Sequence, residues 1–135
     1  FEICAIAGMD VNPAQTTDLA ACKSAAREVI SSGTMQLVTV HFPEGAFTVT
    51  RQGGFFNHPS VAIPDNKIIG TNGAGDAFAA GFLYALHENI DIQTAIISGH
   101  AVAATSVRGI GASDTVESFK RCREIAEEWG WRDAF

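Results

Sequence analysis

The sequence has little charge, few basic residues and no long apolar run. Charged residues make up 18% of its 135 residues, and 9 Lys and Arg against 15 Asp and Glu give a formal net charge of −6. Because the basic residues form no run, nucleic acid and anionic membrane surfaces are poor partners, and we expect neither. No apolar run approaches the ~20 residues that span a bilayer. The 47% hydrophobic content predicts a folded globular protein.

Cysteine and histidine are too few and too widely spaced for a disulfide framework or a zinc site. The three cysteines are Cys4, Cys22 and Cys122, without a Cys-x-x-Cys pair. This usage is typical of reduced thiols in a cytosolic protein, so we expect a cytoplasmic location. The four histidines lack the spacing of metal ligands, and we expect no zinc site.

The most informative segment is residues 70–78, Gly-Thr-Asn-Gly-Ala-Gly-Asp-Ala-Phe. Its small residues stand directly before an acid and a long apolar helical run. Backbone amides at a helix start are unpaired and carry the positive end of the helix dipole, and glycines let an anion approach them. The aspartate in the first turn could act as a base beside a bound phosphate. A phosphoryl-transfer site and a tight structural turn both remain open on these grounds alone.

Hydrophobic periodicity predicts one helix, then strands, then three helices, an order typical of a layered α/β domain. A turn at Asn12-Pro13 precedes the first helix, which is capped by Thr16 or Thr17 and stops at Gly33. Strands are predicted at residues 35–40, 46–50, 55–58 and 67–69. The first of the three later helices is predicted at residues 76–89. The second is predicted to follow a cap at Asp91 and to end at Gly109 and Gly111. The third is predicted to follow a cap at Ser113 or Asp114. Since a parallel sheet needs more strands, we expect part of the protein to be missing from the chain.

Residues 71–83, Thr-Asn-Gly-Ala-Gly-Asp-Ala-Phe-Ala-Ala-Gly-Phe-Leu, resemble the C-terminal signature of the ribokinase (PfkB-type) carbohydrate and nucleoside kinases. The resemblance implies an α/β fold, a ribokinase-like three-layer sandwich with an incomplete, mostly parallel sheet. Residues 1–135 would be its C-terminal portion, without the N-terminal half and the substrate-binding lid. The start at Phe1 rather than Met agrees with that expectation.

The resemblance also implies a reaction, the transfer of the γ-phosphate of ATP to a hydroxyl of a small sugar or related polyol. Gly73, Ala74 and Gly75 would form the anion hole, and Asp76 would be the general base. Elementary chemistry agrees, because phosphoryl transfer depends mainly on positioning and on charge stabilisation. The alternative acceptor is a nucleoside such as adenosine. A non-catalytic nucleotide-binding or structural remnant is the alternative from another functional class.

Five further residues are candidates for nucleotide binding. Residues 37–40 with 44–46 resemble the strand and turn that line the ATP phosphates in the family, which implies roles for Thr39 and Gly45. Here His41-Phe42-Pro43 interrupts that pattern. Thr71, Asn72 and His100 look more like the adenosine kinase branch. A histidine packed within its helix is the alternative for His100.

The expected cations involve two other positions. Glu2 resembles the acid of the family's Asn-x-x-Glu segment, whose Asn would lie upstream of Phe1, and it would help to organise Mg²⁺; a solvated helix acid is the alternative. Gly70 stands where the family commonly has Asp, so a monovalent cation requirement is doubtful. Arg108 could pair with phosphate or complement a helix end. The resemblance leaves open a homodimer through the missing lid.

Overall fold

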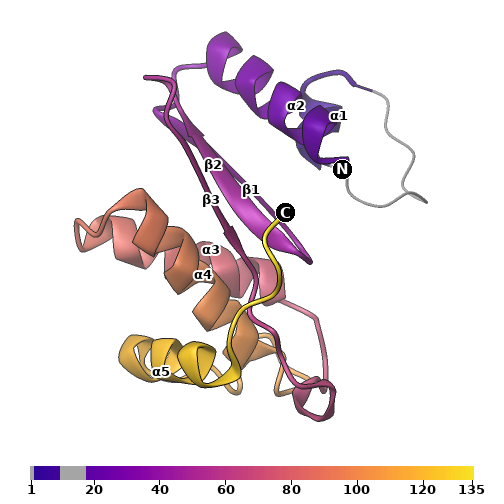
Figure 1. The fold of residues 1–135 in the computed structure, drawn as a ribbon, viewed down its shortest axis with the longest axis vertical. Coiled ribbons are helices and arrows are strands. Elements are labelled where there is room, and N and C mark those ends of the chain that lie inside the picture. The colour runs from indigo at the N-terminus through magenta and orange to yellow at the C-terminus, as the bar shows by residue number, and fades with distance from the viewer. Residues whose placement is uncertain (1, 10–17) are drawn as a thin grey trace. The chain divides into compact units, whose positions relative to one another are not determined.

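The computed structural model describes residues 2–9 and 18–135 (Figure 1). Its elements are α1 (Glu2–Ile6), α2 (Leu19–Ser32), β1 (Leu37–Phe42), β2 (Gly45–Thr50), β3 (Phe55–Pro59), the 3₁₀ helix η1 (Asp65–Lys67), α3 (Ala74–His87), α4 (Ile92–Ser106) and α5 (Phe119–Trp129). They form two compact units. The first is the described part of Phe1–Phe42 with Ala46–Phe56, and the second is Pro43–Gly45 with Asn57–Phe135.

In the first unit, α2 packs against α1 and β1 around an apolar core. The core residues are Cys4, Cys22, Ala25, Ala26, Ile30, Phe47 and Val49. Asp18 is the N-cap of α2, and its Oδ1 accepts a hydrogen bond from the Ala21 amide at 2.9 Å. The C-cap is Gly33, where the sequence predicts the stop. The turn at residues 12–13 and the caps at Thr16 or Thr17 lie outside the described residues.

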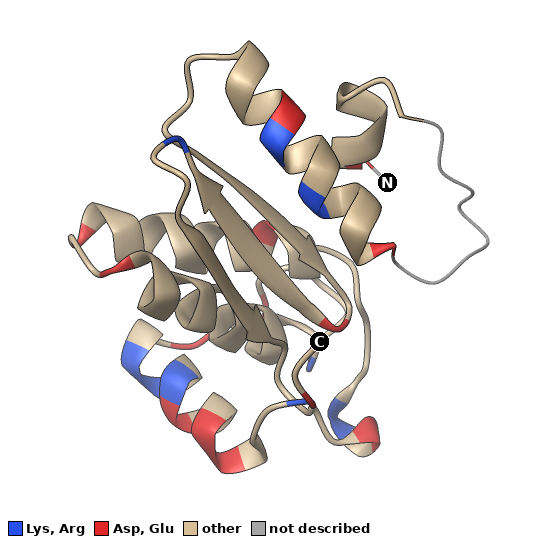
Figure 2. Cartoon of the chain, turned by 45° about the horizontal axis from the view of Figure 1, so that its top comes forward, with Lys and Arg blue, Asp and Glu red and all other residues tan. Residues whose placement is uncertain are grey.

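The three strands form one sheet in the order β1-β2-β3. The connections of two and four residues, 43–44 and 51–54, are too short for a parallel crossover, so these neighbours are antiparallel. A hydrogen bond of 2.8 Å joins the hydroxyls of Thr39 in β1 and Thr48 in β2. The parallel strands that the sequence predicts are therefore not found among the described strands. The three strands β1, β2 and β3 contain no Lys, Arg, Asp or Glu (Figure 2).

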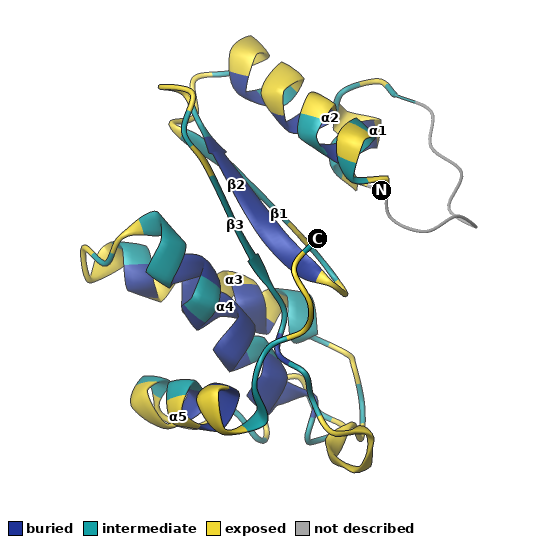
Figure 3. Cartoon of the chain, in the orientation of Figure 1, coloured by how far each residue is buried: buried dark blue, intermediate teal, exposed yellow. Residues whose placement is uncertain are grey.

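In the second unit, α4 packs against both α3 and α5 and is buried along most of its length (Figure 3). Two glycines permit its contact with α3. A Cβ on Gly81 would lie 2.7 Å from Cγ2 of Val102, and a Cβ on Gly99 would lie 2.8 Å from the Phe78 ring. The described helices include none that is long and apolar enough to cross a membrane.

Two sequence predictions about the second unit are wrong. Residues 67–69 form no strand, because Lys67 closes a turn on Pro64 (2.8 Å) and the Ile69 amide bonds to the Val107 carbonyl (2.8 Å). The cap of α5 is Ser118 rather than Ser113 or Asp114. The residues before Ser118 are held by hydrogen bonds to Arg108 instead of entering a helix.

Candidate functional site

The glycine segment lies at the start of α3, as predicted. Gly73 is its N-cap, with a left-handed backbone of φ 77° and ψ 2°. A Cβ on Gly73 would overlap the methyl group of Ala112. Both the backbone conformation and the close approach of Ala112 therefore require glycine here. Because the cap is Gly73, α3 begins at Ala74, slightly before the expected start at Asp76.

The first turn of α3 offers backbone amides to an anion. The Ala74 amide donates to the Thr71 carbonyl at 3.2 Å, and the Ala77 amide donates to the Gly73 carbonyl at 2.8 Å. Among the described residues, no side chain caps this helix start. The amides of Gly75 and Asp76, which precede the first helical hydrogen bond, therefore face an open end with partial positive charge.

Asp76 lies beside these amides, in the same first turn. It is exposed, as are Thr71 and Asn72, whereas the residue that follows it, Ala77, is buried in the core of the second unit. The helix thus anchors the segment by its buried face and leaves a carboxylate accessible next to an anion-binding helix end. Chemically, this arrangement can hold a phosphate and accept a proton from a hydroxyl.

The segment that follows α4 lies against the glycine loop. The amides of Ile69 and Gly70 both donate to the Val107 carbonyl, at 2.8 and 3.2 Å. A Cβ on Gly70 would lie 3.0 Å from the Gly109 carbonyl oxygen. With the contact between Gly73 and Ala112, this shows that residues 107–112 line one side of residues 69–73. The local sequence pattern does not predict this packing of residues 107–112 against residues 69–73.

His100 lies inside the second unit. Its side chain is buried, Nε2 is 3.2 Å from the carbonyl oxygen of His58, and its ring meets that of Phe78 edge-on, with centroids 4.9 Å apart. These contacts favour the alternative of a packed helical histidine over a nucleotide contact.

The remaining candidates divide between the two units. Thr39 and Glu2 lie in the first unit, and the Thr39 hydroxyl bonds to Thr48. Gly45 is buried at the start of β2, where a Cβ would overlap the Phe135 ring and approach the His58 carbonyl oxygen to 2.7 Å. The structure therefore brings Thr71, Asn72 and residues 73–76 together in one unit, and Thr39 and Glu2 do not belong to that group.

The described residues contain no group of three or more His, Cys, Asp and Glu side chains that could hold a metal ion. Mg²⁺ needs no such group, because it keeps several waters and binds through one or two carboxylates and the substrate phosphates. Glu2 is exposed, and a hydrogen bond to its own backbone amide is the main cause that lowers its pKa. It is therefore ionised at neutral pH, and its exposed carboxylate fits that mode of binding.

Comparison with known proteins identifies a family that this sequence matches. The family model described as pfkB family carbohydrate kinase matches residues 2–118. The chain is 39% identical over 77 residues to adenosine kinase of Saccharomyces cerevisiae, which covers 56% of this chain and 23% of that protein. It is 33% identical over 92 residues to 5-dehydro-2-deoxygluconokinase of Halalkalibacterium halodurans, with 68% and 27% covered.

A solved structure shows the same fold. The chain superposes on ribokinase of Arabidopsis thaliana, solved with ribose and ATP, with a TM-score of 0.78 and 20% identity. That match covers 93% of this chain and 38% of the ribokinase chain. The predicted ribokinase-like α/β fold is thereby confirmed. The chain spans about a quarter of the length of the curated relatives, 23% and 27% for the two above.

Proposed function

Since the chain belongs to the pfkB family of carbohydrate kinases, we propose that its complete protein transfers the γ-phosphate of ATP to a hydroxyl of a small sugar or related polyol. We also propose that residues 1–135 are the C-terminal portion of the kinase domain. The observation that carries the proposal is the start of α3, where uncapped amides and an exposed carboxylate lie within one helical turn.

In the proposed mechanism, Asp76 accepts the proton of the acceptor hydroxyl as its oxygen attacks the γ-phosphorus, and the bond from that phosphorus to the β–γ bridging oxygen of ATP breaks. The amides of Gly73 and Gly75 and the dipole of α3 stabilise the charge on the transferred group, and the Ala74 amide would join them by releasing the Thr71 carbonyl. The exposed position of Asp76 leaves its carboxylate free to approach an acceptor.

Mg²⁺ with the nucleotide would neutralise phosphate charge, and Glu2 would help to hold it through its waters. Thr39, Gly45, Thr71 and Asn72 are proposed nucleotide contacts, and His100 would act only through packing. Gly70 provides no carboxylate, so a monovalent cation would lack the ligand that the family's Asp supplies at this position.

A second candidate is a nucleoside kinase. The similarity to an adenosine kinase at 39% identity favours it, and so do Thr71 and Asn72. The two candidates share the same catalytic residues and differ only in the acceptor. A panel of acceptors therefore decides between them without affecting the assignment of Asp76.

The test is ATP consumption by the complete protein with sugars, polyols and nucleosides as acceptors. We expect Asp76→Asn to lower kcat by about 10²–10⁴-fold, the range of general-base catalysis. Asp91→Asn is the matched control, because Asp91 caps α4 outside the site and Asn caps equally well, so kcat should be unchanged. Retained ATP binding without turnover of any acceptor would instead support the non-catalytic alternative.

A further inference from the structure

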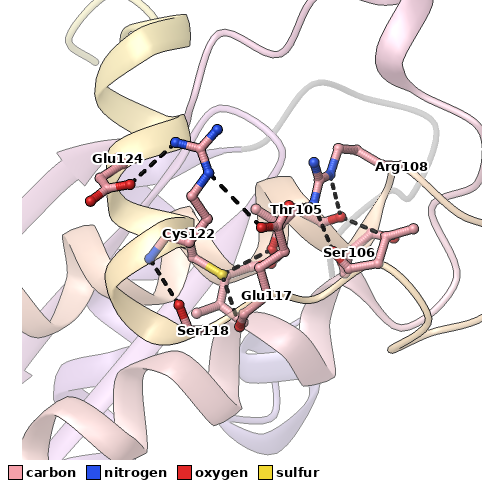
Figure 4. A network of polar contacts seen from close by, with 10 residues as sticks. Thr105, Ser106, Arg108, Glu117, Ser118, Cys122 and Glu124 are labelled. Carbon is pink, nitrogen blue, oxygen red and sulfur yellow. Dashed lines mark hydrogen bonds and ion pairs between the residues drawn. The ribbon is translucent and has the colours of Figure 1, made fainter.

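Arg108 closes the segment that links α4 to α5. Its Nη2 donates to the Thr115 carbonyl at 2.7 Å and to the Glu117 carboxylate at 2.6 Å, and its Nε donates to the Thr105 carbonyl at 3.2 Å (Figure 4). One guanidinium thus joins the last turn of α4 to the residues just before α5. The Thr115 hydroxyl adds a bond to the same Thr105 carbonyl at 2.7 Å.

The enclosed segment, residues 109–114, reaches the glycine loop. The Gly109 carbonyl lies against Gly70, and Ala112 fills the space beside Gly73. A displacement of this segment would therefore move or release the loop whose amides face the anion. Arg108 donates its Nε and Nη2 groups to protein acceptors, which makes it a member of this framework.

The contribution of Arg108 lies in geometry more than in charge. Its side chain is 25% exposed and that of Glu117 is 40% exposed, and ion pairs at such exposure stabilise proteins little. The planar guanidinium, however, holds three acceptors at fixed angles, which a lysine ammonium does not do. Arg121 also pairs with Glu117, at 3.9 Å, but its other ion pair is with Glu124 on α5.

We propose that Arg108 is a positioning residue for phosphoryl transfer, because it holds residues 109–114 against the glycine loop and so keeps the loop amides aimed at the transferred phosphate. This inference rests on the proposed kinase function. A misplacement of about 1 Å can lower a rate by about 10²-fold. Since the loop acts on charge that develops in the transition state, the loss should fall on kcat and leave the KM for ATP nearly unchanged.

The experiment compares Arg108→Gln, Arg108→Lys, Glu117→Gln and the control Arg121→Gln in the complete protein. We expect kcat to fall at least ~10-fold in Arg108→Gln, and less in Arg108→Lys and Glu117→Gln, which keep some of the bonds. Arg121→Gln should keep the wild-type kcat. Deuterium exchange of the amides of residues 70–76 should quicken in Arg108→Gln and not in Arg121→Gln.

The two readouts separate the possible failures. An unchanged kcat and unchanged exchange at residues 70–76 in Arg108→Gln would overturn the positioning role, and so would an equal loss of kcat in Arg121→Gln. If Arg108→Gln does not fold, Glu117→Gln takes its place with the same expected direction. If the wild-type protein phosphorylates no acceptor, the kinase proposal fails, and the exchange data still decide whether Arg108 holds the loop.

Discussion

At the scale of single residues, Gly73 is under two separate steric constraints. Its φ of 77° is strained for any residue with a side chain, and its missing Cβ leaves room for Ala112. Gly53 shares the first constraint alone, because its φ is 88° and no atom lies within 4 Å of its Cβ position. The pair therefore allows backbone strain to be separated from the geometry of the site.

We predict that Gly73→Ala and Gly53→Ala each lower the free energy of unfolding by about 1–3 kcal/mol through strain. Only Gly73→Ala should also lower kcat, by about 10²-fold or more, because its methyl group displaces Ala112 or the anion-hole amides. Denaturant unfolding and initial rates on the complete protein measure the two effects. Equal activity in the two variants would contradict the assignment of residues 73–75 as the anion hole.

At the scale of elements, the start of α4 depends on a side-chain cap. Asp91 Oδ1 accepts a hydrogen bond from the Thr94 amide at 3.0 Å. Hydrogen bonding from the Thr94 amide, and then from its hydroxyl, lowers the pKa of Asp91. A carboxyl group with a lowered folded-state pKa stabilises the protein above its unfolded-state pKa, and that stabilisation is lost as the pH falls through the folded-state value.

We therefore predict that Asp91→Asn and the wild type have similar thermal midpoints at pH 7, because Asn also caps well. As the pH falls below about 4, near the unfolded-state pKa of Asp, the thermal midpoint of the wild type should decrease faster than that of the variant. Thermal melts from pH 7 to pH 2 test this prediction. The difference between the two plots of midpoint against pH removes the contributions of the other carboxyl groups, because both proteins share them. Curves that remain parallel over this range would show that the cap does not titrate as described.

The elements also show what local sequence could predict. The start of α3, the Asp91 cap and the strands around Phe47 and Phe55 follow from turn residues and short-range periodicity, and the structure confirms them. The predicted strand at 67–69 failed because the Ile69 amide bonds to Val107, far along the chain. The predicted cap of α5 was wrong for the same kind of reason, because Arg108 donates hydrogen bonds to Thr115 and Glu117, the residues just before Ser118.

The candidate site divides in the same way. A glycine segment before an apolar helical run predicts a helix start from local sequence, and the structure places residues 73–76 at the start of α3. Their packing against Ala112 was not predictable, because no local pattern says which loop Gly109 and Gly111 will contact. The role of Asp76 itself remains a prediction until its variant is assayed.

At the scale of the whole molecule, the residues that the structure describes form two separate apolar cores. One core includes Cys4, Cys22 and Phe47 in the first unit. The other includes Ala101, Val102 and Cys122 in the second unit. Buried clusters without shared residues tend to open as distinct cooperative units. The glycine loop belongs entirely to the second unit, so its order should depend on the second core.

We predict that core mutations act within their own unit. Phe47→Ala, at a fully buried site in β2, should cost about 3–5 kcal/mol and quicken amide exchange in α2 and β1. Ile96→Ala, at a fully buried site in α4, should cost about 2–5 kcal/mol and quicken exchange in α3 and in residues 70–76. Exchange on the complete protein measures both, and each variant controls for the other. Faster exchange of residues 70–76 in Phe47→Ala would mean that the two cores open together, and the site would then depend on the whole chain rather than on its second unit.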